Sequence, residues 1–459
     1  MSAARLAPWS LALPFAATLG LALLAGTPAR AAPKPLTKEE QAKVDRAIER
    51  GVAYIKRTQL KNGTWHRPQQ NETVTFPLGY AMLPALALLE SGVPADDPCV
   101  QKVADLLRRN VGKMHETYEV SLAVLFLDRL GDSKDEELTR DLGLRLVAFQ
   151  SYSGGWGYNC PTLSKKSRDD LLRALRDFPK EEGTRRGTRK APPSLNRLAI
   201  FRRPSELMRP IEPDDKGYVL YVGTTDNSNT QFALLALWAA RRHGVPIDRT
   251  IRLAVQRFQN SQLRDGTWTY RYPVGGFDNR RPKSSRSMIT VGLLGLAMGY
   301  GVETGEERAR AAVGQQIGKG FAALSRVIDE PTGQMTRPVF QPDLYFLWSA
   351  ERVAVLYDLP EIGDKDWYRW GAEILVTNQK AEGDWRQASG AKFDPRDVMV
   401  GYRPFENTAF ALLFLKRSNL VKGLTAKLPF KPEELNKSIL ATRAGGAPAG
   451  ILSPGLGER

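Results

Sequence analysis

The chain has 459 residues and a formal net charge of +16, and 42% of its residues are hydrophobic. This length exceeds the ~100–200 residues of most domains, but repeat folds often run larger as one unit, so we expect a single large core. The positive charge favours acidic partners, such as polyanionic glycans or anionic envelope lipid, and the absence of a recognition motif in an exported chain argues against nucleic acid.

Residues 1–31 have the features of a secretory signal peptide. Arg5 precedes an uncharged apolar stretch over residues 9–25, and Ala29 to Ala31 supply a small-x-small cleavage pattern. The stretch is short and is interrupted by Pro14, which disfavours a membrane anchor, and no later stretch reaches ~20 uninterrupted apolar residues. We therefore expect an exported protein, periplasmic or extracellular, without a transmembrane span and open to peripheral contact with an anionic envelope.

Two kinds of helix are predicted to alternate along residues 32–428. One kind is apolar on nearly every side, which indicates burial, and the other is amphipathic, which indicates a half-exposed outer helix. Apolar helices are expected to start near residues 77, 119, 229, 287, 344 and 408, and amphipathic helices near residues 39, 98, 134, 247, 306 and 367. Six of each predict an all-α closed double ring with the apolar set inside, and an open solenoid is the alternative.

Two segments depart from this alternation. Residues 158–216 are rich in Lys, Arg and Pro, with a short helix expected only around 168–178, so we interpret them as a basic and partly disordered surface insertion. Residues 429–459 are rich in Pro and Gly and are expected to form a disordered tail. Cys99 and Cys160 are expected on opposite faces of the hairpin array, too far apart for a disulfide.

A seven-residue motif, Gln-x-x-x-Gly-x-Trp, follows four of the amphipathic segments. Its copies are Gln59–Trp65, Gln150–Trp156, Gln262–Trp268 and Gln379–Trp385. The motif resembles the QW motif of squalene and oxidosqualene cyclases, whose superfamily also includes the protein prenyltransferase β-subunits. The chain resembles most closely the exported prenyltransferase/squalene-oxidase-repeat proteins of bacteria. The resemblance implies an (α/α)6 toroid with a central cavity, in which the motifs are structural: the glycine permits the turn and the tryptophan packs on a neighbouring helix.

The catalytic signatures of that superfamily are incomplete in this chain. Cyclases of the squalene-hopene type protonate their substrate from the middle aspartate of D-x-D-D-T-A. Matching that threonine to Thr230 places Asp226 on the first aspartate, Ser228 on the acid and Asn229 on the third. Protein prenyltransferases instead need an Asp, Cys and His zinc set, and neither the three histidines nor the two cysteines show metal-ligand spacing. We therefore expect no metal and no cofactor.

The candidate site residues follow from the ring geometry. In a ring of antiparallel pairs all inner helices begin on one face, so the residues at their starts should gather on one rim. Glu406 is the first candidate acid, because it lies two residues before Thr408, and Asp226 is the second. The candidate ligand-binding residues are Tyr118, Glu119, Asn227, Asn229, Trp238, Arg286, Tyr345, Trp348 and Asn407. Helix capping is the alternative role for the Asp and Asn residues, and core packing for the aromatic ones.

Three functions remain open at this point, and whether the protein is an enzyme is undecided. The first is a protein that binds or processes an isoprenoid-like or envelope ligand in a central cavity. The second is a pectate-lyase-like enzyme acting on an acidic glycan, in which Asp226 and Glu119 bind calcium or substrate and Arg286 is the base. The third is a non-catalytic envelope scaffold. Glu351 and Arg352 interrupt an apolar helix, and a buried pair and a surface pair are both open interpretations.

Overall fold

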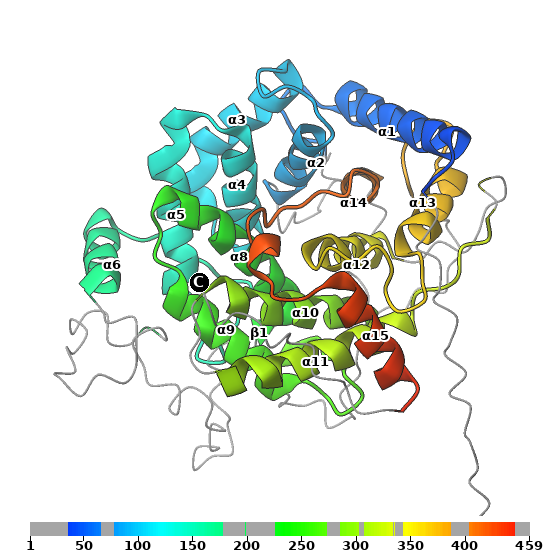
Figure 1. Cartoon of the computed structure of the whole chain (residues 1–459). Coiled ribbons are helices and arrows are strands. Elements are labelled where there is room, and N and C mark those ends of the chain that lie inside the picture. The colour runs from blue at the N-terminus through cyan, green and yellow to red at the C-terminus, as the bar shows by residue number, and fades with distance from the viewer. Residues whose placement is uncertain are drawn as a thin grey trace, which may run out of the picture. The chain divides into compact units, whose positions relative to one another are not determined.

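The computed structural model describes residues 35–65, 78–177, 198, 225–272, 285–302, 307–333, 335, 343–386 and 404–445. Within these ranges the chain is mostly helical (Figure 1). One short antiparallel ladder joins β1 (Thr225–Asp226) to β2 (Arg271–Tyr272). The all-α class predicted from the sequence is confirmed. The expected signal peptide and residues 178–197 and 199–216 of the expected insertion lie outside the described ranges.

All six apolar helices predicted from the sequence are present. They are α2 (Gly79–Glu90), α4 (Thr117–Leu130), α8 (Asn227–Ala240), α10 (Arg286–Gly301), α12 (Leu344–Leu356) and α14 (Pro404–Leu415). Every residue of α8 is buried, as expected for a helix without a polar face. We refer to these six as the inner helices.

The six predicted amphipathic helices are also present. They are α1 (Lys38–Thr58), α3 (Pro98–Asn110), α5 (Glu136–Ala148), α9 (Asp248–Ser261), α11 (Glu307–Ser325) and α13 (Trp367–Asn378). Helix α1 shows how such a helix begins: the Thr37 side chain accepts from the backbone of Glu40, whose carboxylate accepts from the backbone of Thr37. Helices α1, α3 and α9 bury one stripe each, because their apolar residues recur at helical spacing, whereas α5 and α13 are buried on more of their surface.

Neighbouring inner helices contact one another in succession. Helix α2 packs on α4, α4 on α8, α8 on α10, α10 on α12 and α12 on α14, and α14 packs in turn on α2. The first and last inner helices are therefore in direct contact, although more than 300 residues separate their starts. The outer helices lie against this set, with α1 contacting both α13 and α14 (Figure 1).

The four Gln-x-x-x-Gly-x-Trp motifs make the same set of hydrogen bonds. Each glycine has a φ between +77° and +95°, the left-handed region that glycine adopts without strain. Each tryptophan is buried, and its Nε1 donates to the backbone carbonyl ten residues earlier, at 2.7–2.9 Å. These bonds hold the turn against the helix that precedes it, which agrees with a structural role.

The motif glutamines connect one outer helix to another. Each Nε2 donates to its own motif glycine and also to a backbone carbonyl on another outer helix. The second acceptors are Cys99 on α3, Thr250 on α9, Gln316 on α11 and Ala47 on α1, at 2.8–2.9 Å. The last of these bonds, from Gln379 to Ala47, joins the end of α13 to α1 across 332 residues.

Within the described ranges, two helices lie outside the alternating set. Helix α6 (Lys165–Asp177) falls where a short helix was expected in the insertion, and it buries Leu171. Helix α15 (Pro432–Arg443) packs on α11 and buries Leu435 and Ile439. The expectation of a disordered tail from residue 429 is therefore wrong for α15, whose two apolar residues four positions apart are enough to dock one face of a helix. Residues 446–459 lie outside the described ranges.

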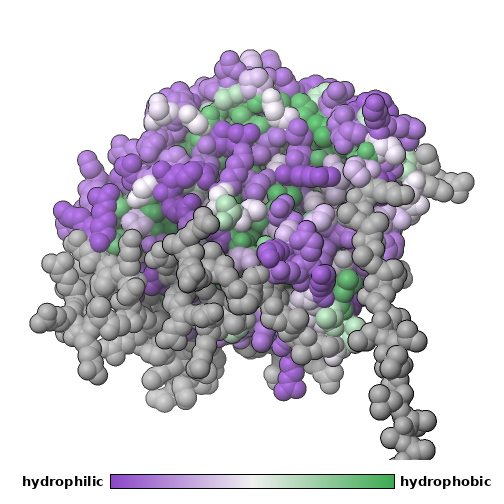
Figure 2. Space-filling view, viewed as in Figure 1, coloured by the Kyte–Doolittle hydropathy of each residue, from purple (hydrophilic) through white to green (hydrophobic). Residues whose placement is uncertain are grey.

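Figure 2 shows a mainly hydrophilic face with smaller hydrophobic areas between the polar side chains. No helix within the described ranges is long and apolar enough to cross a membrane. Cys99 and Cys160 are both buried as free thiols, and burial raises their pKa values to about 11 and about 12.

Candidate functional site

The start of α8 carries three of the residues predicted for the rim, Asp226, Asn227 and Asn229. Asp226 caps this helix: its Oδ1 accepts from the Asn229 backbone N–H at 2.7 Å and its Oδ2 from the Asn229 side-chain amide at 2.8 Å. Burial raises the pKa of Asp226, and the two hydrogen bonds from Asn229 oppose that shift. Both carboxylate oxygens are thus occupied in stabilising the helix start, which is the capping role left open by the sequence.

A buried arginine fixes the residues around that cap. The Arg257 side chain, from α9, is fully buried and donates through Nε and Nη2 to the Asn227 side-chain oxygen at 3.0 and 2.9 Å. Its Nη1 donates to the hydroxyls of Ser153 and Thr225 at 2.9 and 2.8 Å. Burial lowers the pKa of Arg257 to about 9, so the group is still protonated at neutral pH. Arg257 therefore ties the second motif turn, the start of α8 and the β1–β2 ladder together.

A second polar network crosses from α8 to α12 among the inner helices. The Ser228 hydroxyl and the Tyr345 hydroxyl lie 2.8 Å apart, and the Gln231 amide also donates to Tyr345. The Gln231 carbonyl in turn accepts from Arg352, whose guanidinium lies 4.7 Å from the ring centre of Trp348. Burial lowers the pKa of Arg352 to about 10, so this cation persists at neutral pH.

Aromatic side chains from four inner helices surround this network. Phe232 lies 5.4 Å from Trp348, and Phe410 lies 5.0 Å from Trp348 and 5.8 Å from Tyr345, between ring centres. Tyr118 packs edge-on against Phe232 at 5.3 Å. Trp348 and Phe232 are buried, whereas Tyr118, Tyr345 and Phe410 are half-buried. We call these five residues the aromatic cup, as a name for the set of rings and not for a cavity; two of its rings are buried and three are partly exposed.

Two further tyrosines lie beside the partly exposed ring of Tyr118. Tyr158 and Tyr270 are 37% exposed and their hydroxyls lie 3.3 Å apart. The Tyr158 ring also packs edge-on against Tyr118 at 6.0 Å. Burial, and after it the negative charge of Asp226, raises the pKa of Tyr118 and of Tyr270 above the ordinary range. At neutral pH these phenols are therefore hydrogen-bond donors rather than anions.

The start of α14 repeats the start of α8. Thr230 accepts from the Trp156 backbone N–H at 3.1 Å and donates to the Asp226 carbonyl at 2.7 Å. Thr408 likewise accepts from the Trp385 backbone N–H at 3.3 Å and donates to the Pro404 carbonyl at 2.6 Å. Glu406 therefore occupies in α14 the helical position that Ser228 occupies in α8, and Asn407 matches Asn229. Glu406 and Asn407 are both half-buried.

Three of the predicted site residues make their printed contacts outside the five aromatic residues. Glu119 is buried and accepts from the backbone N–H of Leu78 at 2.9 Å and of Gly79 at 3.4 Å, so it caps α2. Trp238 lies at the opposite end of α8, where its Nε1 donates to the Lys422 carbonyl at 3.2 Å. Arg286 is exposed and lies 5.5 Å from the ring centre of Phe346.

The placements of Glu119 and Trp238 each have a physical reason, and Arg286 begins α10 as predicted. Glu119 neighbours Tyr118 in sequence, but successive helical residues point about 100° apart, so one contacts α2 and the other α8. Trp238 is eleven residues beyond the helix start, about 16 Å along the axis at 1.5 Å per residue. The position of a residue along the helix, and not its aromatic character, decides at which end of the inner helices its side chain lies.

Several residues of this region were not predicted as site residues. Gln231, Phe232 and Phe410 looked like ordinary members of apolar helices, and Tyr158 and Tyr270 follow motif turns. Arg352 carried a signal, a charge inside an apolar helix, and Glu351 and Arg352 both prove to be buried. They are not a hydrogen-bonded pair within the described part of the chain, where both Glu351 oxygens have no hydrogen-bond partner. Burial raises the pKa of Glu351 well above its ordinary value.

In the described part of the chain, the carboxylates do not converge as a calcium or zinc site would require. Among the residues that the structure describes, no group of three His, Cys, Asp or Glu side chains could hold a metal ion. The two carboxylates considered for calcium face different helices, since Glu119 caps α2 and Asp226 caps α8. The geometry thus offers hydrogen bonds and aromatic surface at this end rather than a cluster of charges.

A scan against protein-family models gives no match, and a search of the curated proteins finds no similar sequence.

Proposed function

We propose that the alternating helices close into an (α/α)6 toroid, with the inner helices as one ring and the outer helices as a second. Two observations support closure over an open solenoid. The inner helices contact one another in succession, and α14 returns to α2. In addition, Gln379 at the end of α13 bonds to Ala47 on α1 in the way that Gln262 at the end of α9 bonds to Gln316 on α11. An open stack would leave its first and last repeats without such a bond.

We propose that this toroid is an exported protein that binds an isoprenoid-like ligand at the N-terminal ends of its inner helices. The observation that carries the proposal is the aromatic cup, in which α4, α8, α12 and α14 each contribute at least one ring around the Ser228–Tyr345 hydrogen bond. Aromatic faces with few polar groups are typical of small-molecule sites and suit a branched, unsaturated hydrocarbon.

Buried polar groups of Trp348 and Arg352 would orient one end of such a ligand. Trp348 Nε1 and the Nε and Nη1 groups of Arg352 have no hydrogen-bond partner within the described residues. A buried N–H group without a partner costs about 1–3 kcal/mol, so a ligand oxygen that accepts from one of these groups would recover that energy. A hydroxyl or other oxygen-bearing end is therefore expected to point toward Trp348, with the hydrocarbon against Tyr118 and Phe410.

A direct test is to identify what the purified full-length protein carries and binds. We expect native mass spectrometry of protein from its natural host or a bacterial host to reveal a bound lipid. We also expect added farnesol, as a probe, to quench or shift the tryptophan fluorescence. Phe410→Ala should weaken farnesol binding about tenfold, because a ring contact of this size contributes on the order of 1–2 kcal/mol.

A matched control separates the aromatic cup from general loss of packing. Phe430 is 9% exposed and contacts Tyr300 and Tyr357. Phe430→Ala should lower stability but leave farnesol affinity unchanged. Equal loss of affinity in both variants, or no bound lipid and no farnesol response in the unmodified protein, would overturn the binding proposal and favour a scaffold.

A catalytic version of this proposal would depend on Glu406. Its equivalence to Ser228 through Thr408 and Thr230 places a carboxyl group at the helical position that carries the acid in the resembling cyclases. If turnover occurs, Glu406→Gln should abolish it while leaving farnesol binding intact, because only the proton donor is removed. Asp226 is the weaker candidate, since both its oxygens already accept hydrogen bonds from Asn229.

A further inference from the structure

One face of α12 carries three side chains that lead from a half-buried ring to a buried cation. Tyr345, Trp348 and Arg352 are spaced by three and four residues, so they lie on the same side of the helix. Tyr345 is half-buried, whereas Trp348 and Arg352 are buried. The helix rises about 10 Å from Tyr345 to Arg352, at 1.5 Å per residue. Arg352 is therefore at the buried end of this face and Tyr345 at its partly exposed end.

Arg352 makes few of the hydrogen bonds that a guanidinium can make. Its Nη2 donates to the Gln231 side-chain oxygen, and its guanidinium carbon lies 4.7 Å from the ring centre of Trp348. Among the residues that the structure describes, Arg352 Nε and Nη1 have no hydrogen-bond partner, and neither has Trp348 Nε1. These are all buried N–H donors, so the described part of the chain leaves three donors open to an acceptor from elsewhere.

Arg257 shows how this protein buries an arginine that has a structural role. Both Arg257 and Arg352 are buried, but all three side-chain nitrogens of Arg257 donate, to acceptors on Asn227, Ser153 and Thr225. Arg352 is buried to the same degree with one such bond. Because a buried donor without a partner is destabilising, the free nitrogens of Arg352 indicate an acceptor that the described residues do not supply.

Within the described residues, the positive charge of Arg352 has no carboxylate bonded to it. Burial lowers the pKa of Arg352 to about 10, so the guanidinium is protonated at neutral pH. The acidic groups that oppose this shift are Tyr345 and Glu351. Burial raises the pKa of Tyr345, and it raises the pKa of Glu351 well above the ordinary 4.5, so both groups favour their neutral forms. The buried cation therefore lacks a counter-ion in this part of the chain.

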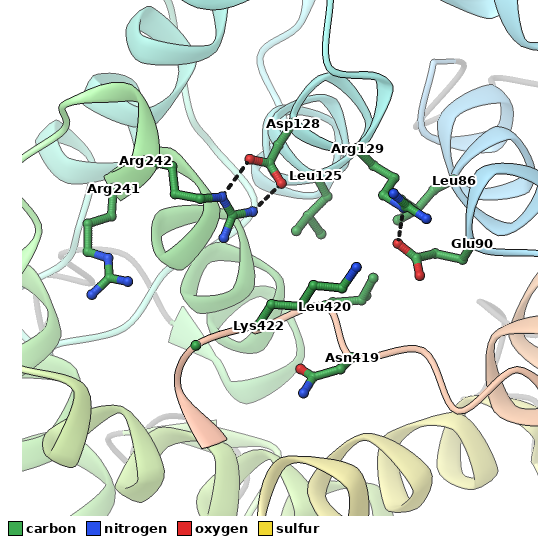
Figure 3. Close-up of a pocket in the computed structure, with 11 residues that line it drawn as sticks. Leu86, Glu90, Leu125, Asp128, Arg129, Arg241, Arg242, Asn419, Leu420 and Lys422 are labelled. Carbon is green, nitrogen blue, oxygen red and sulfur yellow. Dashed lines mark hydrogen bonds and ion pairs between the residues drawn. The ribbon is translucent and has the colours of Figure 1, made fainter. Parts of the chain in front are cut away.

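Two arginines at the opposite end of the inner helices are paired, unlike Arg352. An open pocket of about 500 Å³ lies there, between the last turns of α2 and α4, the residues that follow α8 and the segment between α14 and α15 (Figure 3). Arg129 Nε lies 2.7 Å from a Glu90 carboxylate oxygen, and Arg242 Nε lies 3.1 Å from Asp128 Oδ1. Both arginines are partly exposed and still have carboxylate partners, as Figure 3 shows. Arg352 needs such a partner more, because it is out of contact with water.

We infer that the ligand of the aromatic cup is a hydrophobic monocarboxylic acid, whose carboxylate accepts hydrogen bonds from Arg352 while its hydrocarbon lies against the rings. This inference rests on the proposed function and specifies the charge of the ligand's polar end. A single cation without a counter-ion favours a single negative charge, and an arginine–carboxylate pair is strong where water is excluded. A phosphate monoester would place two negative charges against one guanidinium, so it fits this site less well.

The test is calorimetric titration of the purified full-length protein, near neutral pH, with four probes that share one hydrocarbon: farnesol, farnesoic acid, farnesyl phosphate and farnesylamine. We expect farnesoic acid to bind at least about tenfold more tightly than farnesol, because hydrogen bonds between charged groups are stronger than those of a neutral hydroxyl. Farnesylamine should bind more weakly than farnesol, since its charge repels Arg352. Farnesyl phosphate should bind no more tightly than farnesoic acid.

Variants of Arg352 test whether this residue is the source of the preference. Arg352→Gln should lower the affinity for farnesoic acid to about that for farnesol, and should change the farnesol affinity by less than about threefold. Arg352→Lys keeps the charge and should retain part of the preference for the acid. Circular dichroism should show that both variants are folded.

Arg326→Gln is the matched control, since it removes the same charge from an exposed position just after α11. It should leave the affinity for farnesoic acid unchanged. Equal affinities for farnesol and farnesoic acid, tighter binding of farnesyl phosphate or farnesylamine, or an equal loss in the Arg326 and Arg352 variants would overturn this inference and leave the proposed ligand site standing. If none of the four probes binds, the inference and the proposed function are both overturned.

Discussion

At the N-terminal ends of the inner helices, polar groups are buried and joined in networks, whereas at the C-terminal ends charged groups lie around an open pocket. Arg257 near the first end makes its hydrogen bonds out of contact with water. Arg242 at the second end pairs with Asp128 while its own side chain is 42% exposed. Both are arginines, but the surroundings differ, so their removal should have very different consequences. Buried, hydrogen-bonded groups therefore hold the N-terminal end, whereas partly exposed ion pairs lie at the C-terminal end.

The largest effect is expected at Arg257. Arg257→Met leaves the Asn227 carbonyl and the Ser153 and Thr225 hydroxyls without their common donor inside the protein. We expect the free energy of unfolding to fall by about 3–5 kcal/mol, as for other buried charged networks that lose one member. Chemical denaturation followed by circular dichroism measures this. A loss below about 1 kcal/mol would show that the network at this end does not hold the helix starts together.

At Glu351 we expect a substitution to raise the free energy of unfolding rather than lower it. Burial raises the pKa of this carboxyl well above its ordinary value of 4.5, so the folded state binds the proton more tightly than the unfolded state. The stability due to that proton is fully present below pH 4.5 and is lost as pH rises through the folded pKa. Glu351→Gln should therefore stabilise the protein at pH 8, by about 1–3 kcal/mol, and the gain should shrink toward pH 4. Denaturation curves at several pH values measure it, and a destabilised variant at pH 8 would contradict the prediction.

The motif glutamines should have an intermediate effect. Gln379→Ala removes the bonds to Ala47 and Gly383, at 2.8 and 2.9 Å, and we expect a loss of about 1–2 kcal/mol. Gln315 is exposed on α11, so Gln315→Ala is the matched control. We expect it to change the free energy of unfolding by less than about 0.5 kcal/mol. Hydrogen exchange would add detail, because the Gln379 variant should lose protection in both α1 and α13. Loss confined to α13 would argue against closure between the first and last repeats.

The smallest effect is expected at the charged end. Arg242→Ala breaks an exposed ion pair with Asp128, which typically contributes about 0–1 kcal/mol, and that contribution should disappear in 1 M salt. Thermal unfolding at low and high salt measures the difference. A large, salt-independent loss would mean that this end is as rigidly built as the other, and the comparison would fail.

Much of the fold could be predicted from local patterns. Helix α8 is apolar on every side and α9 on one side, and this difference alone assigned one to the interior and the other to the outside. Gly266 and Trp268 marked their turn because only glycine adopts a φ of +87° freely and because the tryptophan recurs at a fixed offset. Helix α15 was not predicted because the sequence around it is rich in Pro and Gly. Its two buried apolar residues, Leu435 and Ile439, are too few to indicate an amphipathic helix from sequence alone.

The site could be predicted only in part. Asp226, Asn227, Asn229, Tyr345 and Trp348 do lie at one end of the inner helices, because each precedes or begins a helix that starts there. The networks that join them depend on residues far apart in the chain, such as Gln231 and Arg352, which are 121 residues apart. A local sequence pattern spans only a few residues, so it cannot predict a contact between residues that far apart in the chain.

The sequence by itself determined the alternation of buried and half-buried helices and the place of the four motif turns, because helical periodicity and turn chemistry act over a few residues. Only the tertiary structure decided that Glu119 caps α2, that Trp238 belongs to the far end and that Glu351 and Arg352 are both buried. Those outcomes depend on how each helix is rotated about its axis and on what packs against it, and these are settled by the whole set of contacts at once.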